Sequence, residues 1–69
     1  MISDLKEIGK RIRDLRNIVD MSQSELAFEV GTDKAYISRI ERGEVNIGIL
    51  LFIKICFALK VTSKEILDV

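Results

Sequence analysis

The chain has 69 residues, of which 48% are apolar and 32% are charged. This length allows one small domain, residues 1–69, and the composition is typical of a globular protein rather than a disordered one. One Cys and no His exclude a disulfide-stapled secreted scaffold, a zinc site and the histidine-dependent catalytic triads.

The charge and hydropathy patterns indicate a cytoplasmic protein with no membrane partner. Eleven basic and eleven acidic residues give no net charge, which predicts weak non-specific affinity for nucleic acid. The longest unbroken apolar run, residues 49–53, is far shorter than the roughly 20 residues of a membrane span. Residues 1–4 lack the basic and apolar regions of a signal peptide.

The first predicted helix rests on an apolar stripe in which residues recur every three or four positions. Ser3 stands where an N-cap is expected, because its hydroxyl can accept a hydrogen bond from an amide of the first turn. The members of the stripe are Leu5, Ile8, Ile12, Leu15 and Val19.

Two short helices are predicted next. The sequence Ser22-Gln23-Ser24-Glu25 is a capping box that opens the first of them, and Gly31 can adopt the left-handed conformation that ends it. Thr32 or Asp33 can cap the second helix, which Gly43 ends. The expected inward positions are Leu26, Ala27 and Val30 on the first helix and Ile37, Ile40 and, in part, Ala35 on the second.

The rest of the chain predicts two more helices. Residues 44–48 indicate a loop, and residues 49–59 indicate a strongly apolar helix with Cys56 on its inward face, where a buried structural thiol is expected. A second capping box, Thr62-Ser63-Lys64-Glu65, opens a last helical turn. Because no segment alternates with a period of two for long enough to indicate a strand, the predicted fold is all-α with five helices.

Residues 23–42 contain the most informative pattern. Two short helices that cross at roughly 90–120° need a small residue at their approach, a residue that tolerates positive φ at the turn, and apolar side chains that pin the second helix. Ala27 meets the first need, Gly31 the second, and Ile37 with Ile40 the third. This spacing suits a DNA-binding helix-turn-helix, and it also suits an αα-hairpin in a structural helical bundle with no nucleic-acid role.

Four segments extend this pattern over nearly the whole chain: Ile8–Arg16, Met21–Gln23, Glu25–Ala27 and Tyr36–Gly43. Over residues 5–67 the chain resembles the XRE-type family of phage repressor and Cro proteins. The run Tyr-Ile-Ser-Arg-Ile-Glu-Arg is also similar to the small controller proteins of restriction–modification systems. The resemblance implies a compact five-helix repressor-like DNA-binding domain, with a helix-turn-helix formed by the second and third helices. It also implies a recognition helix near residues 33–42, docked as described for phage repressors.

The resemblance implies a function as well. The chain is expected to be a sequence-specific transcriptional regulator, a repressor, that binds double-stranded DNA as a homodimer on a two-fold symmetric operator. No enzymatic activity and no cofactor are expected. The alternative is an antitoxin-type interaction module whose main partner is a toxin protein. RNA polymerase is a further candidate partner of the regulator.

The outward face of the expected recognition helix carries the candidates for base contacts. Arg39 can donate two hydrogen bonds from its guanidinium group to guanine O6 and N7, and Lys34 can bind the same atoms more loosely. Ala35 can contact a thymine methyl group. The alternative is a solvated helix face. Tyr36 can instead bond a phosphate or pack inward, and Asp33 can instead cap the helix. The base-contact candidates are Asp33, Lys34, Ala35, Tyr36, Ser38 and Arg39.

Phosphate contacts are expected at the start of the second helix and after the third. Free amides and the positive end of a helix favour an anion beside Gln23. The phosphate candidates are Ser22, Gln23, Arg42 and Asn46.

The family resemblance implies two further structural features. Arg16 and Glu41 stand where the family pairs an Arg with a Glu, so a structural ion pair is expected between the first helix and the recognition helix. Asp20 and Lys60 stand where the family often has Gly, and both must then adopt a left-handed turn conformation.

The fourth helix predicts a dimer interface, because it is apolar all round and one buried face cannot use all of its side chains. In the family, several of these positions are often polar. The interface candidates are Ile47, Leu50, Leu51 and Phe57.

Overall fold

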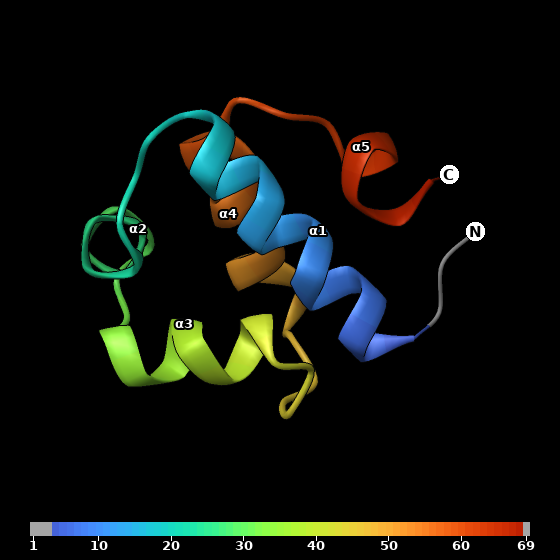
Figure 1. The fold of residues 1–69 in the computed structure, drawn as a ribbon, viewed down its shortest axis with the longest axis horizontal. Coiled ribbons are helices and arrows are strands. Elements are labelled where there is room, and N and C mark those ends of the chain that lie inside the picture. The colour runs from blue at the N-terminus through green and yellow to red at the C-terminus, as the bar shows by residue number, and fades with distance from the viewer. Residues whose placement is uncertain (1–3, 69) are drawn as a thin grey trace.

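The computed structural model describes residues 4–68 and confirms an all-α fold of five helices joined by short connections (Figure 1). The helices are α1 (Leu5–Ile18), α2 (Gln23–Val30), α3 (Lys34–Glu41), α4 (Ile49–Leu59) and α5 (Ser63–Leu67). Figure 1 shows α3 along one edge of the molecule, with α1 crossing between it and α5. No helix in this part of the chain is long and apolar enough to cross a membrane.

Helix α1 begins after Asp4, whose carboxylate accepts a hydrogen bond from the Lys6 amide at 2.9 Å. Ser3, the cap expected from the sequence, lies outside the described residues. The helix ends at Ile18, and Asp20 takes the left-handed conformation with φ of 58°. The prediction that Val19 continues the buried stripe is wrong: this residue follows the last helical turn and its side chain is exposed.

Local signals in the sequence set the bounds of α2 and α3. Ser22 and Glu25 form the predicted capping box, with reciprocal hydrogen bonds of 3.0 and 2.8 Å. Gly31 ends α2 at φ of 81°, and the Asp33 carboxylate caps α3 by accepting from the Tyr36 amide at 2.8 Å. Ala35 is exposed, so the prediction that it lies partly inward is wrong.

The core is aliphatic and draws on all five helices. Helix α3 packs against both α1 and α2, α4 packs against α2, and α5 packs against α1. Six of the core's nine buried members are Ile or Val, whose β-branched side chains have few rotamers and so favour a well-defined packing. Its buried members are Ile12, Leu26, Ala27, Val30, Ile37, Ile40, Ile55, Leu59 and Ile66.

Helices α1 and α3 approach so closely that one position tolerates no side chain. Gly9 is buried in α1, and a Cβ atom there would lie closest to the carbonyl oxygen of Ile40 and 2.7 Å from that of Glu41. Gly9 therefore allows backbone-to-backbone packing that sets the angle of α3 on the core.

Helix α4 spans the predicted residues, and Lys60 ends it in the left-handed conformation with φ of 58°. The Thr62 amide then donates to the Glu65 carboxylate at 2.9 Å, as the second predicted capping box requires. Cys56 packs against the core but is only half-buried, so the expectation of a fully buried thiol is wrong. Burial raises the pKa of this thiol, and the negative charge of Glu65 adds to the effect.

Candidate nucleic-acid interface

Helix α3 presents one continuous outward face. With about 3.6 residues per turn, its outward positions and the residue after its end lie on an arc of about 140°. Ile37 and Ile40 lie on the opposite side of the helix and are buried, whereas Glu41 is buried at the edge of the arc, about 20° from Lys34. The residues of the outward arc are Lys34, Ala35, Ser38, Arg39 and Arg42, of which Ser38 is half-buried and the others exposed.

The two remaining base-contact candidates lie at the edges of this face. Asp33 is the N-cap of α3, with its carboxylate bonded to the Tyr36 amide, so capping occupies at least one of its oxygens. Tyr36 is half-buried and packs against the core at one side. Base contacts by either residue stay predictions.

The phosphate candidates differ in whether their side chains already form hydrogen bonds within the protein. Ser22 is engaged in the α2 capping box, and Nε2 of the Gln23 side chain donates to the Glu41 carboxylate at 3.0 Å. Asn46 is exposed in the 44–48 loop. Arg42 donates from Nε and Nη2 to Glu44 at 2.9 and 3.1 Å, and from Nη1 to the Ser38 hydroxyl.

A buried ion pair fixes α3 to the rest of the domain. Arg16 donates to the Glu41 carboxylate from Nε at 2.7 Å and from Nη2 at 3.1 Å. Its Nη1 donates to the carbonyl oxygen of Met21 at 2.8 Å. Arg16 and Glu41 are only 8% and 7% exposed. Every buried side-chain nitrogen and oxygen within residues 4–68 has a hydrogen-bond partner, including those of this pair. The pair therefore joins α1 to the last turn of α3 without leaving a buried polar atom unbonded.

Sequence reasoning missed Glu44, although a local signal was present. Gly43 has φ of 75°, its amide donates to the Ile40 carbonyl at 3.0 Å, and the Glu44 amide donates to the Arg39 carbonyl at 2.9 Å. This is a Schellman motif, which folds the residue after the glycine back over the last helical turn. The glycine could therefore have predicted that Glu44 lies beside Arg39.

The candidate dimer residues do not share one environment. Leu50 and Phe57 are 72% and 79% exposed, whereas Ile47 and Leu51 are half-buried and pack against the core. Ile49 and Ile53 are also exposed on α4. The structure therefore narrows the exposed apolar face of α4 to Ile49, Leu50, Ile53 and Phe57.

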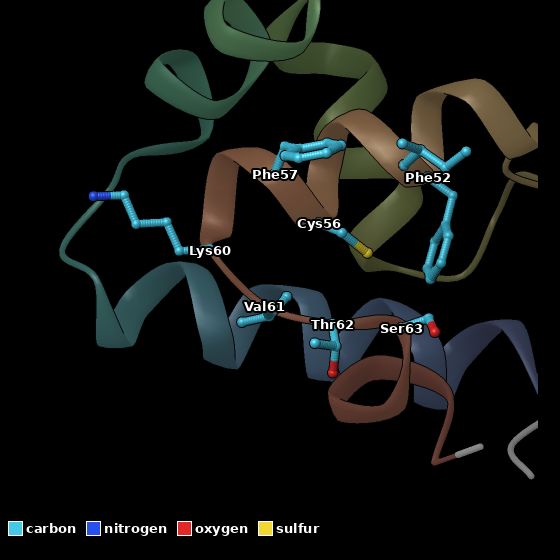
Figure 2. A pocket seen from close by; sticks show the side chains of 8 residues that line it. Phe52, Cys56, Phe57, Lys60, Val61, Thr62 and Ser63 are labelled. Carbon is cyan, nitrogen blue, oxygen red and sulfur yellow. The ribbon is translucent and has the colours of Figure 1, made fainter.

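An apolar pocket of about 360 Å³ adjoins this face. Figure 2 shows it between α4 and the segment from Lys60 to Ser63, with Phe57 and Phe52 on α4 and Val61 on the connecting segment. Its walls carry few polar groups, so it adds apolar surface to the exposed face of α4.

Comparisons with known proteins agree with this geometry. Residues 12–66 match the sequence profile of the helix-turn-helix family. The chain is 43% identical over 61 residues to the control protein C.BamHI of Bacillus amyloliquefaciens, covering 87% of this chain and 75% of that protein. It is 35% identical to the control protein C.SmaI of Serratia marcescens, covering 93% of this chain and 77% of that one. The crystal structure of the restriction-modification controller protein C.AhdI of Aeromonas hydrophila superposes with a TM-score of 0.87, at 35% identity, over 94% of this chain and 98% of that one.

Proposed function

The chain belongs to the XRE-type helix-turn-helix family of DNA-binding transcriptional regulators, which are not enzymes, and we propose that it acts as a homodimeric repressor. Each subunit places α3 in the major groove of one half of a two-fold symmetric operator. The relatives named as controllers of restriction–modification systems support a role in regulating such a system.

The observation that carries this proposal is the outward arc of α3. Lys34 and Arg39 supply donors, and Ala35 and Ser38 are short enough for the helix to come close to base edges. Two buried isoleucines anchor the opposite side of the helix and the buried Glu41 anchors its last turn, so the arc is presented on a rigid support.

A mobility-shift titration tests the proposal. The probe is the duplex upstream of the chain's own coding sequence, and the competitor is an unrelated duplex of equal length. We expect a discrete shift that survives the competitor and is lost at high salt, since phosphate contacts release counterions. A structural helical bundle would give no shift at any salt concentration.

Arg39 and Arg42 are expected to have different roles. Arg39→Ala removes a base contact, which costs roughly 1–3 kcal/mol and relaxes the preference at one base pair of each half-site. Arg42→Ala removes a phosphate contact, weakens all sequences alike and lowers the salt slope by about 1. Selection of each variant on random duplexes separates the two effects. An unchanged consensus for Arg39→Ala with an altered one for Arg42→Ala would reverse the assignment.

The exposed apolar face of α4 is proposed as the dimer interface. Leu50→Glu places a charge on this face, so we expect a monomer at micromolar concentration and DNA affinity about 100-fold lower, because the two half-sites are then bound independently. Ile18→Glu is the matched control, since Ile18 is equally exposed but lies at the end of α1. Sedimentation decides the point. A monomeric wild-type protein, or a Leu50→Glu variant that sediments as a dimer, would reject this interface.

A further inference from the structure

The Glu44 carboxylate lies between two arginines of the proposed DNA-binding face. Its oxygens accept from Arg42 Nε at 2.9 Å and Arg42 Nη2 at 3.1 Å, and one of them lies 4.0 Å from Arg39 Nε. A carboxylate with two oxygens on a guanidinium edge has the same bidentate geometry as a phosphate on that edge. Arg42 Nη1 meanwhile donates to Ser38.

The backbone holds Glu44 in this position. The Schellman motif bonds the Glu44 amide to the Arg39 carbonyl at 2.9 Å, and Gly43 supplies the left-handed turn that this motif needs. In such motifs the residue after the glycine usually makes an apolar contact with the last helical turn. Here the equivalent contact is the charged one between Glu44 and Arg39. The turn after α3 therefore places a negative charge on the outward face of the same helix.

This cluster is exposed, unlike the Arg16–Glu41 pair. The side chains of Arg42 and Glu44 are 55% and 49% exposed, and exposed pairs are weak because water and salt screen them. Hydrogen bonds from Arg42 hold the pKa of the Glu44 carboxylate below its usual value, so it stays charged near neutral pH. The bond is thus present in the free protein and weak enough for DNA to replace it.

We propose that Glu44 is an internal competitor for DNA phosphate. It occupies the Nε–Nη2 edge of Arg42 in the free protein, and a backbone phosphate displaces it when DNA binds. The inference rests on the proposed phosphate contact of Arg42. Glu44 hydrogen-bonds Arg42, whereas its 4.0 Å separation from Arg39 Nε is longer than a hydrogen bond. Glu44 therefore lowers the affinity for all DNA sequences alike without changing which sequence is preferred, and it reduces binding to non-operator DNA at low salt.

The test measures binding of one operator duplex and one unrelated duplex over a range of salt concentrations. Glu44→Gln keeps the size of the side chain and removes its charge. We expect about fivefold tighter binding to both duplexes at low salt and a salt slope steeper by about 1. Circular dichroism checks that the exposed substitution leaves the fold intact.

Two controls separate competition from a general loss of negative charge. Asp68→Asn makes the same change in net charge at the end of α5, where the exposed Asp68 takes a left-handed conformation that Asn also tolerates, and should alter affinity less than about twofold. In an Arg42→Ala background, Glu44→Gln should lose most of its effect on affinity, because the guanidinium for which Glu44 competes is then absent.

The outcomes are distinct. Equal or weaker binding by Glu44→Gln would overturn the inference, and so would a gain that persists in the Arg42→Ala background or that Asp68→Asn reproduces. Wild-type protein that binds neither duplex would instead overturn the proposed function.

Discussion

Arg16→Ala should leave the protein largely unfolded at room temperature. The substitution removes the guanidinium that bonds both oxygens of the buried Glu41 carboxylate and the Met21 carbonyl. An uncompensated buried charge costs on the order of 3–5 kcal/mol. In a domain of 69 residues that loss approaches the whole free energy of unfolding. Urea denaturation followed by circular dichroism measures it directly.

The same helix offers a matched control. Arg13 forms an ion pair with Asp14 at 3.5 Å, but the two side chains are 47% and 53% exposed. Arg13→Ala should therefore change the free energy of unfolding by less than about 0.5 kcal/mol. If Arg16→Ala cost no more than Arg13→Ala, the buried pair would not be what holds α3 in place.

Gly9→Ala should also destabilise the fold, by about 3 kcal/mol, because the new methyl group would lie 2.7 Å from the Glu41 carbonyl oxygen. The two helices must then move apart and lose packing around Ile12 and Ile40. Intrinsic helix propensity predicts the opposite sign, since Ala is favoured over Gly by about 1 kcal/mol inside a helix. The sign of the measured change therefore distinguishes close packing from propensity.

Gly48→Ala serves as the control for this substitution. Gly48 precedes α4 with φ of −68°, and a Cβ atom there would meet nothing within 4 Å. Its free energy of unfolding should stay within about 1 kcal/mol of the wild type. A Gly9→Ala protein as stable as the Gly48→Ala protein would contradict the close approach of α1 and α3.

Local sequence signals predicted the helices well because capping is a short-range interaction. The two capping boxes and the left-handed Gly31 set helix ends through contacts between residues at most five apart. Helical periodicity likewise predicted which side of α3 points outward. Val19 was misplaced because the stripe continues past the residue at which the helix stops, and periodicity alone does not show where that is.

Features that depend on distant residues were harder to predict. The clash that makes Gly9 necessary involves the carbonyls of Ile40 and Glu41, 31 and 32 positions later, and nothing near Gly9 in the sequence indicates it. The bond from Gln23 to Glu41 depends in the same way on how α2 and α3 cross, so Gln23 was expected only as a phosphate contact. On α4, apolar composition could not separate the exposed Leu50 from the half-buried Leu51.

Selection of random DNA duplexes by the pure wild-type protein tests the central claim most directly. If a dimer presents two α3 helices to one face of the duplex, the enriched pool should contain one consensus made of two inverted half-sites. Their centres should lie about 10 base pairs apart, one turn of the double helix. A pool with no enriched sequence, or a consensus without two-fold symmetry, would contradict the account.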